Sequence, residues 1–372
     1  MSNDSGSSTI PTPIIKAMGP AGGPSIQRDA QKANLPASAI RRMNLNECPY
    51  PPSPKAIAAM QAACAVVNYY PDPKWRDLVA ALAARTGFAE NRIIIGNGSD
   101  EAIVQAGRVA LMPGDEVIAP VPSFPGYYKC REVNGGALVP VKVREDGAND
   151  VDAMLAAVTD RTRIVFCATP NNPTGAMITA AEVERLATGL PDTVLLVLDE
   201  AYHEFGMHAG GEDLLPAMAK RTGPWVVFRT FSKAYGLAGI RVGYVLCGSD
   251  EMAESFQKVR SVFNVNAVGQ AGALAALDDM EHVQGILDAT AQERGRIVEG
   301  LKKLGFDPFP TVGNFVTAKG PNPAADVVGA LEERGIMISR LMAPGYENYI
   351  RVTVARPEDT DALLAALSEI MG

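Results

Sequence analysis

The sequence predicts an α/β protein, in which a mostly parallel seven-stranded sheet flanked by helices is joined to a smaller α+β domain. Two observations carry this prediction. Short β-branched and aliphatic runs alternate with Ala-rich amphipathic stretches from about residue 75 to about residue 275, as in βα units around a parallel sheet. Beyond about residue 280 this alternation gives way to one long charged helical stretch, followed by separate strands and helices.

The seven expected strands are short apolar runs. Such runs are typical of strands that are buried on both faces, so helices should cover both sides of the sheet. The strands are expected at residues 93–95, 116–119, 137–141, 164–168, 194–198, 226–229 and 242–246.

The C-terminal part lacks the regular alternation of short apolar runs and Ala-rich stretches. Its expected elements are a helix over 281–304, a strand over 315–317, a helix ending at Arg334 and Gly335, strands around Ile336 and Ile350, and a terminal helix from Pro357. The segment before about Pro54 is rich in Pro and Gly and has little periodicity, which indicates an arm. We expect an arm over 1–45, a large domain over 46–275, and a small domain over 276–372 that packs with the arm.

The composition excludes several classes of protein. With 34 basic and 42 acidic residues the net charge is -8, the wrong sign for binding nucleic acid. No apolar run approaches the roughly 18 residues of a membrane span, and residues 1–9 lack the features of a secretion signal. The five cysteines form no CxxC pair and only three histidines are present, so we expect a cytoplasmic protein without a metal site or a membrane partner.

A glycine turn follows the first expected strand. Strand 93–95 leads into Gly98, Ser99 and Asp100 and then into a helix, whose N-terminal N–H groups and dipole favour a phosphate. Glycine after a strand is also ordinary turn geometry. The segment lacks the third glycine of a dinucleotide fingerprint and the lysine of a P-loop, so it does not define a phosphate site by itself.

Two other segments place polar residues at strand ends. Strand 194–198 is followed by Asp199, at the edge where ligands collect in open α/β sheets, although an aspartate there is also a common helix N-cap. Strand 164–168 leads into a turn that contains Asn172. By itself this turn indicates no function, and Asn172 becomes a candidate site residue only together with the other segments.

Lys233 stands directly after an expected strand, among hydroxyl-bearing and small residues. A lysine that forms a Schiff base must be desolvated enough to lose its proton. Thr230, Ser232 and Arg241 lie close to it in the sequence and suit a phosphate dianion. The segment therefore indicates a lysine that carries a phosphorylated carbonyl cofactor.

In their order and spacing, these segments resemble the class I and II aminotransferases of fold type I, which use pyridoxal 5′-phosphate. The matching motifs are NNPTG, DEAY, SKAYGLAG and the downstream Arg241-Val242-Gly243, and the resemblance covers nearly the whole chain. It implies that Lys233 carries the cofactor as a Schiff base and shuttles the substrate proton. It also implies that Asp199 pairs with the pyridinium nitrogen, while Tyr202 and Asn172 hydrogen-bond to the phenolic oxygen.

The resemblance assigns further residues to the cofactor. The phosphate cup would be formed by Gly98, Ser99, Asp100, Thr230, Ser232 and Arg241. Phe124 matches the aromatic residue that stacks on the cofactor ring. Tyr70 matches a tyrosine that reaches the cofactor phosphate of the neighbouring subunit, which implies a homodimer.

Within this class the nearest resemblance is to the histidinol-phosphate aminotransferases of histidine biosynthesis. It is carried by LNECP around Asn46, by the segments around Tyr70 and by the extended DEAYHEF and TFSKAYGLAG motifs. Asn46 and Arg351 are implied to bind substrate, together with a second arginine, Arg340. Arg340 is displaced by about one residue from the family position, and such a shift turns a strand side chain to the opposite face unless a bulge compensates.

The predicted reaction is ping-pong transfer of the amino group of L-histidinol phosphate to 2-oxoglutarate, giving imidazole-acetol phosphate and L-glutamate. The alternatives are an aromatic or other amino-acid aminotransferase of the same branch and a decarboxylase of a phosphorylated amino acid. A non-enzymatic module that binds the cofactor would need an interaction domain, for which the chain has no spare residues beyond the arm.

Overall fold

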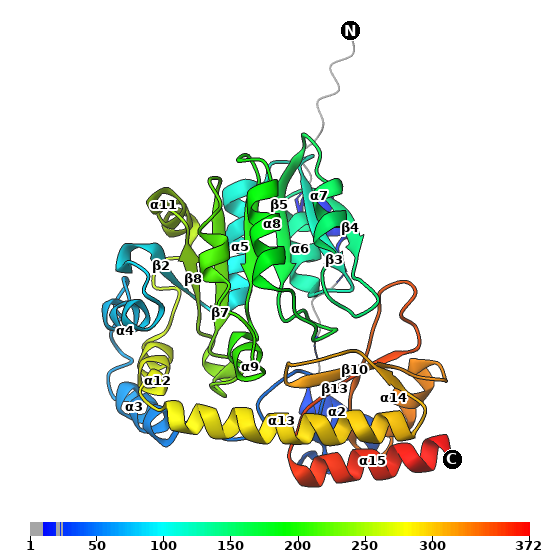
Figure 1. Ribbon diagram of the computed structural model, residues 1–372. Helices are drawn as coiled ribbons and strands as arrows, with labels where there is room; N and C mark the ends of the chain where they lie inside the picture. Colours follow the sequence, from blue (N-terminus) through cyan, green and yellow to red (C-terminus); the bar gives the residue numbers. More distant parts are fainter. Residues whose placement is uncertain (1–9, 20–22, 24) are drawn as a thin grey trace.

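The computed structural model describes residues 10–19, 23 and 25–372, so the prediction made for residues 1–9 lies outside it. Figure 1 shows a large sheet with its helices above the long helix α13 (Met280–Lys303), which continues beneath a smaller sheet. Among the described residues, no helix is both long and apolar enough to cross a membrane.

The large sheet has seven strands, which confirms the predicted fold class. In spatial order they are β2 (Ile93–Gly96), β8 (Gly243–Cys247), β7 (Trp225–Thr230), β6 (Leu195–Asp199), β5 (Thr162–Ala168), β3 (Glu116–Val121) and β4 (Ala137–Lys142). Strand β8 runs antiparallel to both neighbours, and all other pairs are parallel. Residues of β2, β6, β7 and β8 are buried throughout, whereas the edge strand β4 is partly exposed.

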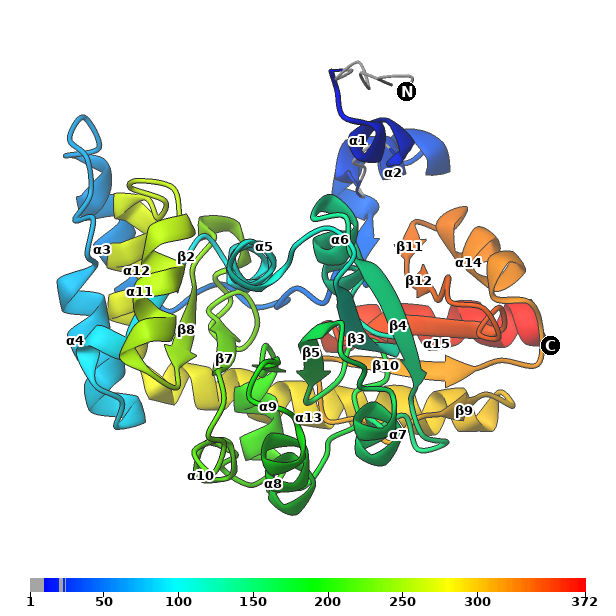
Figure 2. The ribbon, with the colours of Figure 1, turned by 90° about the horizontal axis from the view of Figure 1, so that it is seen from above.

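Helices cover both faces of this sheet. The helices in this part of the chain are α3 (Pro54–Cys64), α4 (Arg76–Thr86), α5 (Ser99–Ala110), α6 (Pro125–Val133), α7 (Val151–Ala156), α8 (Ala180–Gly189), α9 (His203–His208), α10 (Leu215–Met218), α11 (Asp250–Val259) and α12 (Ala267–Leu277), of which α3 and α12 pack on each other. Figure 2 shows α5 and α6 on one side of the sheet and α7, α8 and α10 on the other. The parallel strands point their carboxyl ends toward the same edge of the sheet, and α5 begins at that edge, after β2.

The smaller sheet has four strands, in the order β12 (Ser339–Arg340), β13 (Tyr349–Thr353), β10 (Phe315–Lys319) and β9 (Asp307–Pro308). Helices α14 (Ala324–Glu332) and α15 (Pro357–Met371) accompany it, as predicted. The two-residue strand β9 was not predicted, because a run that short has no periodicity to detect.

The N-terminal segment holds structure that its sequence pattern did not predict. It forms α1 (Pro13–Ala17), α2 (Ile26–Ala33) and β1 (Arg41–Arg42), which pairs in parallel with β11 (Ile336–Met337). Three short 3-10 helices complete the elements, at Ala37–Ala39, Glu90–Arg92 and Ala238–Ile240. Helix α2 is amphipathic: Ile26, Ala30 and Ala33, spaced by four and three residues, share one face and pack in a small cluster with Leu35, Ile40 and Met337.

The described residues form two large hydrophobic clusters. Val283 and Leu287, near the start of α13, belong to the cluster around the seven-stranded sheet, whereas Ile297 and Leu301 belong to the cluster around the smaller sheet. Helix α13 therefore contributes to both clusters and joins the two parts of the protein. The domain boundary between residues 275 and 276 stays a prediction.

Candidate active site

A cavity of about 350 Å³ lies at the carboxyl ends of β5, β6 and β7. It is lined by Leu45, Asn46, Ser99, Asp100, Phe124, Pro125, Tyr127, Ala168, Pro170, Asn172, Asp199, Ala201, Tyr202, Thr230, Ser232, Lys233, Arg241 and Arg351. Every residue predicted for the site is among them except Gly98, Tyr70 and Arg340. The fold thus brings together segments that are far apart in the sequence.

Lys233 enters the cavity from the loop after β7. Its Nζ donates a hydrogen bond to the backbone carbonyl of Asn46 over 3.0 Å and lies 5.7 Å from the centre of the Tyr202 ring. Burial, and then the positive charge of Arg351, lower the pKa of Lys233 to about 8. A lysine with this pKa has a substantial neutral fraction near neutral pH, which a nucleophilic amine needs.

Asp199 ends strand β6 and is 5% exposed. Its Oδ2 accepts a hydrogen bond from the Tyr127 hydroxyl over 2.6 Å, and its Oδ1 accepts one from the Ala201 N–H over 3.0 Å. Burial raises the pKa of Asp199 to about 6 in spite of these donors. Both oxygens are therefore held in a fixed direction at the cavity wall.

Asn46 is 2% exposed and adopts a left-handed backbone with φ of 53°, a conformation that asparagine tolerates better than most residues. Its Nδ2 donates to the Tyr202 hydroxyl over 3.0 Å, and its Oδ1 accepts from the Thr353 hydroxyl over 3.1 Å. Burial raises the pKa of Tyr202 to about 12. The amide of Asn46, which was predicted to bind substrate, is thus engaged by protein groups on both of its polar atoms.

Helix α5 begins at the cavity, with Gly98 as its N-cap. Gly98 has φ of 79°, and a Cβ atom there would lie 2.4 Å from Nη2 of Arg241. Arg241 donates from Nη1 to the Ser232 hydroxyl over 3.3 Å. A guanidinium, hydroxyls and a helix N-terminus therefore converge, which is the donor set that a phosphate requires.

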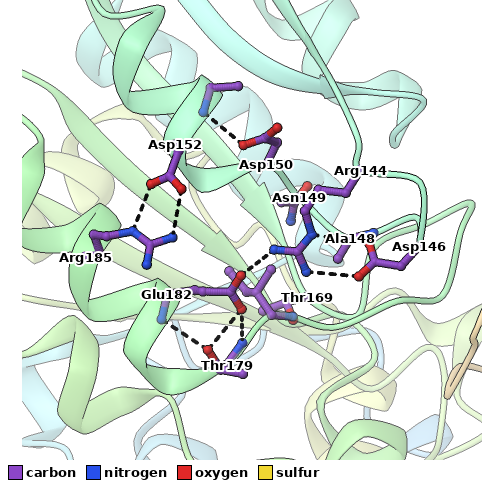
Figure 3. Close-up of polar contacts among 12 residues, drawn as sticks. Arg144, Asp146, Ala148, Asn149, Asp150, Asp152, Thr169, Thr179, Glu182 and Arg185 are labelled. Carbon is purple, nitrogen blue, oxygen red and sulfur yellow. Dashed lines mark hydrogen bonds and ion pairs between the residues drawn. The ribbon is translucent and has the colours of Figure 1, made fainter.

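The loop that carries Asn172 is fixed at both ends. At its start, Asn149 Nδ2 donates to the Ala168 carbonyl over 2.6 Å. At its end, Thr179 and Glu182 form a capping box at the N-terminus of α8, and Glu182 also pairs with Arg144 (Figure 3). Because these contacts anchor the loop to the large sheet, Asn172 is held at the cavity wall.

Arg351, on β13, brings a positive charge into the cavity from the smaller sheet. Its Nη1 donates to Asn172 Oδ1 over 2.8 Å and its Nη2 donates to the Asn44 carbonyl over 2.8 Å. Its Nε is buried and has no hydrogen-bond partner, and none of the ion pairs among the described residues includes Arg351. Burial lowers the pKa of this guanidinium. Such a group is prepared to receive an oxyanion.

Arg340 lies elsewhere. Its register partner across the smaller sheet is Ile350, whereas Ser339 is paired with Arg351. Arg340 therefore lies on the other face of the strand from Ser339, and it is exposed outside the cavity. No bulge compensates for the one-residue displacement seen in the sequence, and Ser339 Oγ takes the place near Arg351 Nη2, at 3.4 Å.

Tyr70 also lies outside the cavity. Its side chain is 81% exposed and stacks on Phe263, with ring centroids 4.5 Å apart. The surrounding surface carries the exposed apolar side chains Val66, Val67, Tyr69 and Val262.

Tyr127 was not predicted from the sequence. It lies on α6, is 1% exposed, and reaches the cavity next to Asp199. Its position in the aromatic pair Tyr127-Tyr128 three residues after Phe124 gave no sign of a polar role, because buried aromatic residues on a helix are by default core.

The chain belongs to the family "Aminotransferase class I and II", whose profile matches residues 40–367. It is therefore an aminotransferase, as this site and fold indicate.

Several relatives share most of its length. It is 36% identical to histidinol-phosphate aminotransferase 1 of Mesorhizobium japonicum, over 89% of this chain and 90% of that protein. It is 40% identical to histidinol-phosphate aminotransferase of Jannaschia sp., over 89% of this chain and 91% of that protein. The solved structure of histidinol-phosphate aminotransferase from Sinorhizobium meliloti in complex with pyridoxal-5′-phosphate matches 97% of both chains, with a TM-score of 0.90 and 31% identity.

Proposed function

We propose that this aminotransferase transfers the amino group of L-histidinol phosphate to 2-oxoglutarate, giving imidazole-acetol phosphate and L-glutamate. The observation that carries the proposal is Arg351, a guanidinium that faces the Lys233 cavity with a buried Nε and no carboxylate partner among the described residues. Both substrates present an oxyanion, a phosphate in one case and a carboxylate in the other, and one arginine can receive either in turn. The names of the relatives support the same substrate.

The donor set of the cavity fits pyridoxal 5′-phosphate. When bound, this cofactor supplies an electron sink for the electrons released as the substrate Cα–H bond breaks. Arg241, Ser232 and the N-terminus of α5 would hold its phosphate. Asp199 would hold a proton on the ring nitrogen, which its fixed orientation supports.

Three groups would act beside the ring. Tyr202 and Asn172 would donate hydrogen bonds to the phenolic oxygen; the Tyr202 proton is free for this purpose because its oxygen accepts from Asn46. Lys233 would remove the proton from the substrate Cα and return it at C4′ of the cofactor, for which its lowered pKa of about 8 is suited.

We also propose that the chain works as a homodimer in the cytoplasm. The exposed Tyr70, held by Phe263 within an apolar surface, supports a contact in which Tyr70 reaches the phosphate of the partner's cofactor. Buried free cysteines Cys130, Cys167 and Cys247 support a reducing compartment.

Hybrid dimers test the shared site. Tyr70→Ala and Lys233→Ala should each be nearly inactive as pure proteins. After subunit exchange, about a quarter of wild-type activity should return, because half of the dimers then contain one intact site. No recovery upon exchange would count against a site completed by the partner.

Product analysis tests the reaction. With pyridoxal 5′-phosphate and 2-oxoglutarate present, L-histidinol phosphate should yield L-glutamate stoichiometrically, and a phosphorylated amino acid that carries a carboxylate, such as O-phospho-L-serine, should release no CO₂. Phenylalanine and tyrosine serve as competing donors. Faster glutamate formation from an aromatic amino acid, or CO₂ release from the phosphorylated amino acid without glutamate formation, would reject the proposed reaction.

A further inference from the structure

Tyr127 is a buried tyrosine whose hydroxyl is aimed at a single group. Its ring stacks on Phe166, with centroids 4.4 Å apart and an interplanar angle of 12°, and meets Phe124 edge-on at 5.8 Å. Its hydroxyl donates to Asp199 Oδ2 over 2.6 Å. The aromatic contacts on the ring fix the direction of this hydrogen bond.

The hydrogen bond acts on the charge of Asp199. A hydroxyl that donates to a carboxylate stabilises the ionised form, and the short distance is that of a charge-assisted bond. Tyr127 remains a donor throughout the physiological range, because burial and the neighbouring Asp199 hold its pKa well above the usual value.

The other charged and titratable side chains near Asp199 do not donate a hydrogen bond that stabilises its ionised form. Glu200, which follows it, and Asp100 on α5 are negative and raise its pKa, as does its burial. Lys233 faces it from the loop after β7, and Cys167 on β5 and Tyr202 face the Tyr127 hydroxyl. The side-chain donor to the carboxylate is Tyr127; the second donor is the Ala201 N–H.

We propose that Tyr127 is a positioning residue, which keeps Asp199 ionised and oriented toward the ring nitrogen of the cofactor. The inference deepens the proposed function and rests on the cofactor part of it, not on the identity of the amino donor. Loss of the hydroxyl should leave the fold intact and make Asp199 easier to protonate, so that the ion pair with the ring nitrogen fails at a higher pH.

The chain offers a matched pair of variants. Tyr127→Phe removes only the hydroxyl aimed at Asp199. Tyr128→Phe removes the hydroxyl of the next residue on α6, which donates to the Pro120 carbonyl over 2.7 Å and accepts from the Ser123 N–H over 3.0 Å. The two variants therefore differ in which group loses its hydrogen bond, not in the chemistry of the substitution.

The measurement is the dissociation constant of the apoenzyme for pyridoxal 5′-phosphate between about pH 5.5 and pH 8.5. In Tyr127→Phe the pH at which binding weakens on the acid side should rise by about one unit, with about tenfold weaker binding near pH 6.5. Tyr128→Phe should follow the wild type. The cofactor phosphate titrates in the same range in every variant, so the difference between variants is the readout.

Curves for Tyr127→Phe that superimpose on the wild type, or an equal shift in Tyr128→Phe, would overturn the proposal. Thermal unfolding of the apoenzymes checks the fold. If Tyr127→Phe does not fold, 3-fluorotyrosine at position 127 replaces it. Its hydroxyl is a stronger donor, so the pH at which cofactor binding weakens on the acid side must then fall below that of the wild type. Since no amino donor is used, failure of L-histidinol phosphate as a substrate would leave this test unaffected, whereas a wild type that does not bind the cofactor would reject the proposed function itself.

Discussion

The side-chain amide of Asn46 donates to the hydroxyl of Tyr202 over 3.0 Å, while the backbone carbonyl of the same residue accepts from Lys233 Nζ over 3.0 Å. Asn46 in turn is held by Thr353, two residues beyond Arg351 on β13, and by Asn314, which donates to its carbonyl over 3.0 Å. One residue therefore links the strand that carries Arg351 to both Tyr202 and Lys233.

Asn46→Asp should reverse the first of these hydrogen bonds. A carboxylate only accepts, so Tyr202 would donate to position 46 and lose the proton it offers to the cofactor. We expect turnover to fall by about tenfold or more and the pH titration of the cofactor absorbance to shift upward. Asn46→Gly, which tolerates φ of 53° and adds no charge, is the control. If Asn46→Asp titrates like the wild type, the direction assigned to this hydrogen bond is wrong.

Burial, and after it the positive charge of Arg351, should set the pH at which Lys233 reacts. The pKa of Lys233 is lowered to about 8, so addition of the cofactor to the apoenzyme should speed up as pH rises and level off above about pH 8. Arg351→Gln removes a neighbouring cation and should move this midpoint to higher pH.

Arg340→Gln is the matched control for that measurement, because Arg340 is an exposed arginine outside the cavity. Its midpoint and its KM for the amino donor should equal those of the wild type. An unchanged midpoint in Arg351→Gln, or a shifted one in Arg340→Gln, would contradict the placement of the two arginines.

Gly98→Ala should weaken binding of the cofactor phosphate. The added Cβ would meet Arg241 Nη2 at 2.4 Å, so the guanidinium would have to leave the N-terminus of α5. Gly87→Ala is the control without a steric clash, since Gly87 also has a positive φ, of 73°, but no atom lies within 4 Å of its Cβ position. Gly87→Ala should lose about 1 kcal/mol of stability. Gly98→Ala should lose more, because its φ of 79° with ψ of 164° is a backbone region that is essentially restricted to glycine. Only Gly98→Ala should show a weaker affinity for pyridoxal 5′-phosphate by fluorescence titration. Equal affinities would show that Arg241 does not need this position.

A buried ion pair stabilises the strand ends that carry the site. Glu200, directly after Asp199, pairs with Arg229, directly before Thr230, at 2.7 Å, and both are nearly inaccessible. Arg229 is the main attraction that lowers the pKa of Glu200 to about 2, so the pair should stabilise the fold above about pH 4.5 and lose this effect as pH falls toward 2.

Glu200→Ala should therefore reduce the free energy of unfolding by about 3–5 kcal/mol near neutral pH, measured by urea denaturation. Glu254→Ala breaks the exposed pair with Lys258 and should lower it by less than about 1 kcal/mol. Similar losses in the two variants would argue that burial of the Glu200–Arg229 pair is not what matters.

The sequence predicted the large sheet well, because strands buried on both faces are marked by continuous apolar runs and their ends by polar motifs such as those at Asp199 and Lys233. It could not place residues whose role depends on contacts distant in the chain. Tyr127 appears as an ordinary core aromatic until α6 packs on β3 and β4 and its hydroxyl reaches Asp199 at the end of β6. Asn46 contacts Thr353 and Tyr202 through its amide, which no sequence pattern indicated, and its predicted role in substrate binding stays a prediction. For Arg340, the one-residue displacement did indicate the outer face of its strand, and the absence of a bulge leaves it there.

The most direct test of the proposed reaction is a single half-reaction. Enzyme loaded with pyridoxal 5′-phosphate is mixed with L-histidinol phosphate, and the absorbance of the cofactor is followed. 2-Oxoglutarate is then added to convert the pyridoxamine form of the cofactor back to the pyridoxal form. We predict conversion to the pyridoxamine form and full recovery with 2-oxoglutarate, and much slower conversion with L-phenylalanine. Conversion by L-phenylalanine with none by L-histidinol phosphate would contradict the proposed substrate.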